Sequence, residues 1–245
     1  MRRTRVLVDA ALTPGSLVEL PDAAARHLTT VLRLRAGDPF IAFDGRNDIE
    51  AEAVLESVGR KRATARILTT TRVTRESPLD LTLVQAISSS EKMDFTLQKA
   101  VELGVKRITP VWSARSQRRL KPPQVEKRLR HWQGVVTHAT EQSGRTRRAR
   151  LDPPTTLADW IGTRDPARGG IVLDPRATEG LASLSAPESG LDIHIGPEGG
   201  FSDDELGMMA HAGIRRLRMG PRILRTETAG IAVLAWLQTR FGDCG

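Results

Sequence analysis

Cysteine, long apolar runs and metal-ligand clusters are what this sequence most lacks. The only cysteine among its 245 residues is Cys244, so we expect neither a disulfide framework nor a cysteine-based zinc site. His131 and His138 lie too far apart for the i, i+4 pair of a helical zinc site, and no metal is predicted. No apolar run approaches the ~20 residues of a membrane span or forms a secretory leader. These absences predict a soluble, cytoplasmic protein.

Aromatic side chains are also scarce, at 4% of the chain, and tyrosine is absent. This argues against a nucleic-acid surface built for base stacking. Positive charge is abundant, because 37 lysines and arginines outnumber 29 acidic residues and leave a formal net charge of +8. Such an excess favours a polyanionic partner, most often nucleic acid, contacted through its phosphates and folded shape.

The first 71 residues mostly alternate between apolar and polar positions, as half-buried strands do. The clearest cases are residues 49–56 and 62–68, and Asp44-Gly45 before them marks a tight turn. Residues 21–28 begin with proline and are typical of a short helix. We therefore predict a small β-barrel with one inserted helix. A polar stretch at 71–80 then predicts a division into domains 1–74 and 75–245.

After residue 80, strand and helix patterns alternate, which predicts βα units and a mainly parallel sheet of an α/β fold. Strands are expected at 81–87, 106–112, 171–174, 191–195 and 214–219. Helices are expected after Glu91, ending at Gly104, and at 122–142 and 232–241. The last of these has apolar residues on more than one side, which favours burial on two faces. Topology rules alone predict an ordinary, unknotted doubly wound sheet.

Two glycine-rich turns each follow a predicted strand and lead into a predicted helix. They are Ile195-Gly-Pro-Glu-Gly-Gly200 and Met219-Gly-Pro-Arg-Ile-Leu-Arg-Thr-Glu-Thr-Ala-Gly230. Open α/β sheets bind ligands at the carboxyl ends of their strands, and glycine lets the backbone approach a ligand closely. Ser202 and Glu205 after the first turn match a helix capping box. Neither turn is a phosphate-binding P-loop or a dinucleotide fingerprint.

Five stretches of this sequence carry a resemblance to a known family. They are Ile195-Gly-Pro-Glu-Gly-Gly-Phe-Ser, Gly220-Pro-Arg-Ile-Leu-Arg-Thr-Glu-Thr-Ala, Glu91-Lys-Met-Asp-Phe-Thr-Leu-Gln-Lys-Ala-Val-Glu-Leu-Gly-Val105, Ile108-Thr-Pro110 and Glu141-Gln-Ser-Gly-Arg145. With these stretches the chain resembles the RsmE-type small-subunit ribosomal RNA uracil-N3 methyltransferases, which belong to the SPOUT class. The resemblance covers essentially the whole chain and is strongest from about residue 77.

The resemblance implies a fold, a reaction and partners. The fold would be a C-terminal SPOUT-type α/β trefoil-knot domain with a parallel sheet, preceded by a PUA-like RNA-binding β-barrel. The reaction would be S-adenosylmethionine-dependent methylation of N3 of a uridine in the decoding region of 16S rRNA. The substrate would be naked rRNA or the assembled small subunit, and the enzyme would be a homodimer.

The family pattern also implies which residues hold the cofactor. Backbone groups of the two turns, an apolar pair around the adenine and the end of one strand would form the site. These residues are Leu173, Gly196, Pro197, Glu198, Gly199, Gly200, Met219, Gly220, Ile223, Leu224 and Thr226.

Uracil N3 must lose its proton before it accepts a methyl group, and the negative charge then spreads onto O2 and O4. A guanidinium that hydrogen-bonds those oxygens stabilises the anion. The candidates are Arg225 and Arg222, with Arg145 third. A carboxylate could act as general base, and the sequence leaves three options open, namely Glu141, Glu198 and Glu227.

Contacts to RNA are expected on the barrel and on the basic run after Glu141-Gln142. The candidate residues are Arg26, His27, Arg33, Arg46, Arg115, Arg147 and Arg148. Two alternatives remain open: a ribose 2′-O-methyltransferase of the same superfold, and a non-catalytic RNA-binding or ribosome-assembly factor. The modified atom separates the first from the uracil-N3 reaction, and failure to bind S-adenosylmethionine would identify the second.

Overall fold

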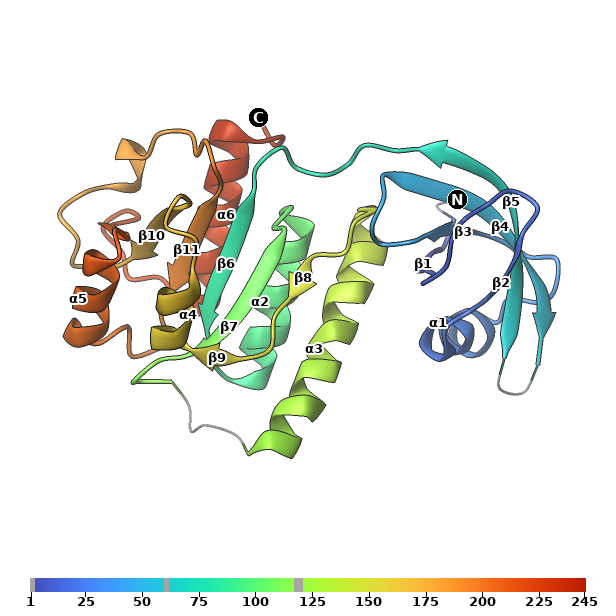
Figure 1. The fold of residues 1–245 in the computed structure, drawn as a ribbon, viewed down its shortest axis with the longest axis horizontal. Coiled ribbons are helices and arrows are strands. Elements are labelled where there is room, and N and C mark those ends of the chain that lie inside the picture. The colour runs from blue at the N-terminus through green and yellow to red at the C-terminus, as the bar shows by residue number, and fades with distance from the viewer. Residues whose placement is uncertain (1–2, 60–61, 117–120) are drawn as a thin grey trace. The chain divides into compact units, whose positions relative to one another are not determined.

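The computed structural model describes residues 3–59, 62–116 and 121–245, which form two compact units (Figure 1). The first unit runs to Glu76 and also takes in Thr140–Arg148. The second consists of Ser77–Ala139 and Ala149–Gly245. The chain therefore returns once to the first unit. The domain bounds 1–74 and 75–245 stay a prediction.

The first unit is a five-stranded sheet around one apolar core. Its strand order is β1-β3-β4-β5-β2, with β1 parallel to β3 and the other neighbours antiparallel. The alternation predicted for residues 49–56 is confirmed, because Ala51, Ala53 and Leu55 are completely buried. The strands are β1 (Arg5–Leu7), β2 (Leu17–Glu19), β3 (Pro39–Phe43), β4 (Ile49–Val58) and β5 (Ala63–Arg72).

The short helix predicted after Pro21 is confirmed as α1 (Asp22–Arg26), which continues into a π-helical turn, His27–Val31. Its buried residues pack on the sheet of the first unit. The turn predicted at Asp44 is confirmed too. The Asp44 carboxylate accepts hydrogen bonds from the backbone N–H groups of Arg46 and Asn47 at 2.9 and 2.8 Å. A short polar side chain of this kind favours a turn over a continuing strand.

The second unit is a sheet whose strand pairs are all parallel, in the order β12-β10-β11-β6-β7-β8, with β9 also paired to β7. The chain thus places β11 between β6 and β10. The longer strands match the predicted ones, whereas the two-residue strands β8 and β9 carry no periodic signal. The strands are β6 (Leu81–Ala86), β7 (Arg107–Trp112), β8 (Arg150–Leu151), β9 (Thr155–Thr156), β10 (Gly169–Leu173), β11 (Leu191–Ile195) and β12 (Arg215–Leu217).

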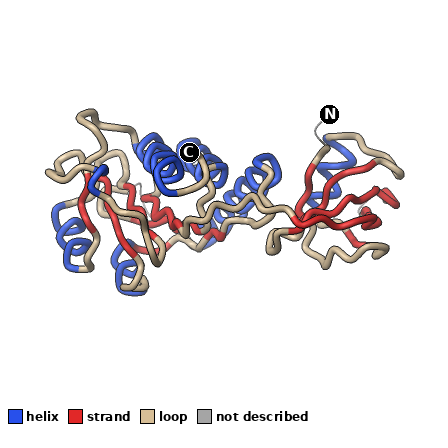
Figure 2. Tube along the Cα trace, turned by 90° about the horizontal axis from the view of Figure 1, so that it is seen from above, coloured by secondary structure: helices blue, strands red, loops and turns tan. Residues whose placement is uncertain are grey.

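Helices cover both faces of this parallel sheet (Figure 2). Neighbouring strand residues such as Leu83 and Val84 point into different cores, one shared with α2, α3 and α6 and the other with α4 and α5. A strand buried on both faces is rich in apolar residues, and every residue of β6 is buried, including the polar Thr82 and Gln85. The helices are α2 (Ser90–Glu102), α3 (Pro122–Ser143), α4 (Leu157–Thr163), α5 (Asp203–His211) and α6 (Thr226–Phe241), with a short 3₁₀ turn at Leu181–Ser183.

The last helix begins at Thr226 and not at residue 232, which corrects the prediction. Its first turns contain Thr226, Thr228 and Gly230, residue types with low helix propensity, so the sequence pattern is weak there. The early start matters because it brings the helix N-terminus to the carboxyl edge of the sheet. Within the described parts of the chain, no helix combines the length and apolar character needed to cross a bilayer.

Candidate functional site

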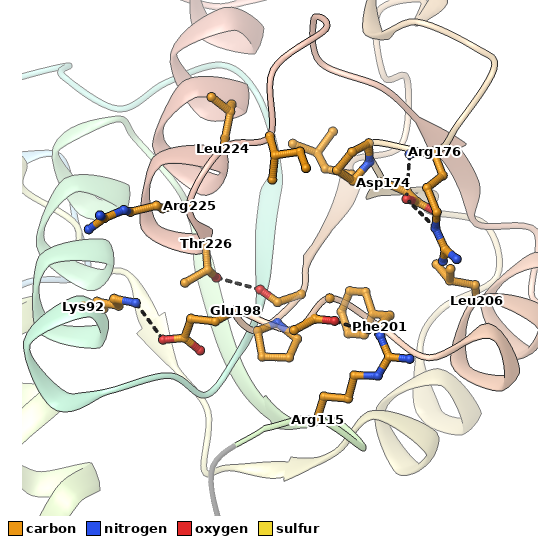
Figure 3. A pocket seen from close by; sticks show the side chains of 17 residues that line it. Lys92, Arg115, Asp174, Arg176, Glu198, Phe201, Leu206, Leu224, Arg225 and Thr226 are labelled. Carbon is orange, nitrogen blue, oxygen red and sulfur yellow. Dashed lines mark hydrogen bonds and ion pairs between the residues drawn. The ribbon is translucent and has the colours of Figure 1, made fainter.

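A cavity of about 620 Å³ opens at the carboxyl edge of the parallel sheet (Figure 3). It is formed by the ends of β10 and β11, the glycine-rich turn after β11 and the segment that enters α6. Its lining combines apolar side chains with both cationic and anionic groups. The size falls within the ~300–1,000 Å³ typical of sites for small organic ligands.

The turn after β11 has a backbone that favours glycine. Gly200 has φ +68°, a left-handed conformation that other residues adopt only with strain. A Cβ on Gly196 would lie 3.3 Å from the Gly200 Cα and from Phe201, so a side chain there would crowd the turn itself. The Gly200 N–H donates to the Pro197 carbonyl at 2.8 Å and closes the turn.

Thr226 connects this turn to α6 and β6. Its hydroxyl donates to the Gly196 carbonyl at 2.6 Å and accepts a hydrogen bond from the buried Gln85 side chain at 2.9 Å (Figure 3). Because Thr226 is the first residue of α6, this pair of bonds fixes the helix N-terminus against the glycine-rich turn. The two motifs that sequence analysis singled out are therefore parts of one site.

Two further side chains, those of Arg115 and Glu205, hold the turn and the residues that follow it. Arg115 donates to the Gly199 carbonyl at 2.8 Å. Glu205 accepts from the backbone N–H of Ser202 at 2.8 Å and from that of Ala114 at 2.6 Å. The predicted capping box of Ser202 and Glu205 is confirmed. Glu205 thus joins the start of α5 to the loop that follows β7.

Asp174 and Arg176 form the cavity wall beyond the end of β10. The Asp174 carboxylate receives Arg216 at 2.5 Å and the backbone N–H of Arg176 at 2.9 Å. Burial acts to raise the pKa of Asp174, but these hydrogen bonds outweigh it and hold the pKa below its ordinary value. Arg176 also pairs with Asp203 at 3.0 Å. An ionised carboxylate therefore stands at this wall.

Lys92 and Glu198 form a pair on the side of the cavity opposite Asp174 (Figure 3). The Lys92 Nζ lies 2.8 Å from Glu198 Oε1. Partial burial acts to raise the pKa of Glu198, yet the hydrogen bonds from Lys92 and from its own backbone dominate and lower it. Glu198 is therefore ionised at neutral pH and a weak proton acceptor.

Most of the predicted cofactor residues lie together in this cavity, as does Arg225, the first candidate for anion stabilisation. Two do not. Met219 and Gly220 line a separate shallow hollow with Leu181 and Trp236. The predicted cofactor residues in the cavity are Leu173, Gly196, Pro197, Glu198, Gly199, Gly200, Ile223, Leu224 and Thr226.

Two other catalytic candidates do not line the cavity, although they directly precede and follow the lining residues 223–226 in the chain. Arg222 is exposed in the segment before α6. Glu227 is half-buried in the first turn of α6, and its Oε2 atom is buried without a hydrogen-bond partner among the described residues. Their catalytic roles stay predictions.

Glu141 and Arg145 belong to the first unit, where they make structural contacts. Glu141 Oε1 accepts from the Leu7 backbone N–H at 3.0 Å. Arg145 is buried and binds Glu76 through Nε at 3.0 Å and Nη2 at 2.6 Å. Since these contacts fix the Thr140–Arg148 segment, they count against a catalytic part for either residue, which stays a prediction.

The predicted RNA contacts fall into two groups. Arg26, Arg33 and Arg148 are exposed and His27 is half-exposed, all in the first unit. The other three are exposed as well: Arg46 pairs with Asp9, Arg147 binds Asp48 at 2.8 and 2.9 Å, and Arg115 donates to the Gly199 carbonyl.

Sequence reasoning missed several cavity residues. Asp174 had a usable signal, because it is the last residue of a predicted strand, at the edge where ligands bind. Lys92 lies inside a motif that carried the resemblance, but nothing in its spacing assigned it a role. Arg176 and Leu206 reach the cavity only through the tertiary fold. The missed residues are Lys92, Asp174, Pro175, Arg176, Phe201 and Leu206.

The fold and site define an α/β protein with a cavity, sized for a small organic ligand and lined by apolar and charged groups, beside the N-terminus of its last helix. Comparison with known families narrows this class. Residues 75–238 match the model of an RNA methyltransferase domain, and residues 20–68 match that of an RNA methyltransferase PUA domain.

Individual relatives align with nearly the full length of this chain. Ribosomal RNA small subunit methyltransferase E of Buchnera aphidicola (from Schizaphis graminum) is 33% identical and aligns over 99% of this chain and 98% of its own. A methyltransferase of Legionella pneumophila in complex with S-adenosylmethionine is 35% identical, with a TM-score of 0.95 over 99% of this chain and 100% of its own. Ribosomal RNA small subunit methyltransferase E of Neisseria gonorrhoeae, bound to S-adenosylmethionine, is 36% identical, with a TM-score of 0.92 and full coverage of both chains.

The chain belongs to the ribosomal RNA small subunit methyltransferase E family of RNA methyltransferases. The predicted fold class, a SPOUT-type α/β knot domain with a parallel sheet and a PUA-like barrel, is confirmed. The ordinary doubly wound sheet that general topology rules favoured is the wrong alternative.

Proposed function

We propose that this protein transfers a methyl group from S-adenosylmethionine to N3 of a uridine in 16S rRNA of the small ribosomal subunit. The observation that carries the proposal is the cavity where the two glycine-rich motifs meet through Thr226. Family membership and the S-adenosylmethionine bound to the Legionella and Neisseria proteins support the choice of cofactor. The names of the relatives support rRNA as the substrate.

The residues of the cavity fit this cofactor. The Gly196–Gly200 turn lines the cavity and can present backbone groups to a flat adenine. A Cβ would meet open space at Gly200, whereas at Gly196 and Gly199 it would meet the turn itself and Arg115. Leu173, Ile223 and Leu224 offer apolar surface, while the ionised Asp174 can accept hydrogen bonds from hydroxyl or ammonium groups. A zwitterionic nucleoside needs such a mixed lining.

When bound, S-adenosylmethionine supplies an electrophilic methyl group. The residues of this chain then orient the two reactants and stabilise charge. Arg225 lines the cavity at the N-cap of α6, where its guanidinium can hydrogen-bond the uracil oxygens and stabilise the N3 anion. Because the pKa of Glu198 is lowered, we infer that Glu198 does not act as the general base.

We propose that the exposed arginines of the first unit, Arg26, Arg33 and Arg148, contact rRNA phosphates. Arg46 and Arg147 contribute if RNA displaces their acidic partners, and Arg115 contributes if RNA displaces the Gly199 carbonyl. We also propose that the protein is a cytoplasmic homodimer. Support for a second copy comes from apolar side chains left on the second unit: Ile223 is 83% exposed, and Trp236 beside Phe241 is half-buried. Sedimentation analysis of the purified chain tests the dimer.

The proposed reaction is tested by incubating unmethylated small subunits and naked 16S rRNA with the protein and S-adenosylmethionine. Mass mapping of nuclease fragments should find one methyl group on the base of one uridine. A methyl group on a ribose would support the 2′-O-methyltransferase alternative, and absence of any methylated product would support the non-catalytic one.

A further inference from the structure

Lys92 occupies an electrostatically unfavourable place on its helix. It is the third residue of α2, where the helix dipole favours anions and disfavours cations. Its ion pair with Glu198 is partly exposed, with side-chain exposures of 28% and 44%, and such pairs contribute little to stability. Stability therefore does not explain the ammonium at this position, and a role in the cavity does.

The fold brings Lys92 to the same end of the site as Arg225. The helices α2 and α6 pack against each other, with Leu97 and Val101 in the same core as Val233 and Leu237. Both helices begin at the carboxyl edge of the sheet, because each follows a parallel strand.

Lys92 therefore lies in the first turn of one helix and Arg225 at the N-cap of the other. Both line the cavity, and Figure 3 shows them on the side opposite Asp174 and Arg176.

Glu198 holds the Lys92 ammonium over the cavity. An ammonium has three N–H donors, and Glu198 Oε1, at 2.8 Å, needs only one of them. The carboxylate comes from the glycine-rich turn, so the ammonium is tied to the segment that forms the cofactor cradle. Glu198 thus acts as a positioning residue for Lys92.

On the basis of the proposed function, we propose that Lys92 is a catalytic residue that binds a uracil oxygen together with Arg225 and stabilises the N3 anion. The N3 proton passes to a solvent hydroxide ion and forms water. The N3 electron pair then forms the bond to the methyl carbon, while the electron pair of the breaking C–S bond stays on sulfur. An opposite charge within ~4–6 Å lowers the pKa of an acid by about 1–3 units, so the ammonium increases the fraction of anion at neutral pH.

The test compares Lys92→Met and Lys92→Arg with the unaltered chain and with Lys99→Met. Lys99 is a matched control, because it lies on the same helix, is 32% exposed and pairs with Glu102 at 2.8 Å. Single-turnover methylation of 16S rRNA is measured across pH with saturating S-adenosylmethionine. In parallel, an RNA with 5-fluorouridine at the mapped target is titrated by ¹⁹F NMR in the presence of S-adenosylhomocysteine, which reports N3 ionisation without turnover.

Lys92→Met should raise the apparent pKa, in both the rate profile and the fluorine titration, by about 1 unit or more. Each unit should make the reaction at neutral pH roughly ten-fold slower, because the fraction of N3 anion falls by that factor. Lys92→Arg should retain most of the unaltered behaviour, and Lys99→Met all of it. Should Lys92→Met unfold, Lys92→Gln removes the same charge. An unchanged apparent pKa in the charge-removing variant overturns the proposal, whatever its rate. Failure of the unaltered chain to bind the donor or methylate uridine would instead contradict the proposed function.

Discussion

At the scale of single residues, the site depends on side chains whose surroundings fix their charge state. Asp174 and Glu198 are carboxylates kept ionised by cationic and backbone donors. Arg225 differs, because it lines the cavity from the exposed N-cap of α6. We therefore propose that Arg225, together with Lys92, stabilises the developing anion, and that the two carboxylates do not take part in proton transfer.

Replacing Arg225 with Ala should lower the single-turnover rate by about 10²–10³-fold, as the loss of one preorganised donor to a developing anion typically does. The affinity for S-adenosylmethionine should change little, because the cradle is formed by the glycine-rich turn and Thr226. Rate measurements combined with calorimetry on the variant separate the two effects. An unaltered rate would remove Arg225 from the mechanism.

His194 on β11 predicts a pH dependence of folding stability. It is fully buried. Its Nδ1–H donates to the Ile171 carbonyl at 2.9 Å, and its Nε2 accepts a hydrogen bond from the Trp160 indole N–H at 3.2 Å. Because Nε2 accepts, it carries no proton and the ring is neutral. Burial lowers the pKa of His194 from 6.5 to about 4.

Because the folded-state pKa of His194 lies below the unfolded one, its stabilisation is complete above pH 6.5 and is lost as pH falls toward 4. The slope should approach about 1.4 kcal/mol per pH unit, with a total near 3 kcal/mol. Denaturant unfolding between pH 5 and 7 measures this slope, with His194→Gln as the non-titrating control. Equal slopes for both proteins would contradict the assignment.

At the scale of elements, the glycine-rich turn after β11 is defined by its backbone. Gly200→Ala puts a Cβ into open space but at φ +68°, so it should destabilise the protein by about 1–2 kcal/mol and weaken S-adenosylmethionine binding. The control is Gly207→Ala in α5, which also meets open space but has helical backbone and should stabilise by about 0.5–1 kcal/mol. Thermal melts and calorimetry of both variants test this; equal effects would show that backbone strain at Gly200 is unimportant.

The sequence was informative about elements wherever periodicity or a cap was strong. Residues 49–56 and the Ser202–Glu205 capping box were predicted correctly, and two segments of the cavity were found as glycine-rich motifs. The wall formed by Asp174 and Arg176 was missed. The first turns of α6 were missed, because threonine and glycine form helices poorly and tertiary contacts of Thr226 determine the start. The order of the strands, with β11 between β6 and β10, was not predicted, since local patterns do not encode which strands pair. The knot was implied only by the family resemblance.

At the scale of the whole molecule, the net charge of +8 predicts how RNA binding responds to salt. Each phosphate contact should contribute roughly 0.7 to the slope of log affinity against log salt concentration for single-stranded RNA. Titrations of a 16S rRNA fragment between low and physiological salt measure the slope. Reversing Arg26, Arg33 and Arg148 to glutamate should flatten it, and a salt-independent affinity of the unaltered chain would exclude the basic surfaces as the RNA site.

The central claim is that the cavity beside Thr226 is a methyl-donor site, and calorimetric titration of the purified chain with S-adenosylmethionine tests it most directly. We predict saturable binding with one site per chain. The affinity should be weakened by Gly200→Ala and preserved in Arg225→Ala. Absence of binding heat at all temperatures tried, or equal binding by the Gly200 variant, would contradict the claim.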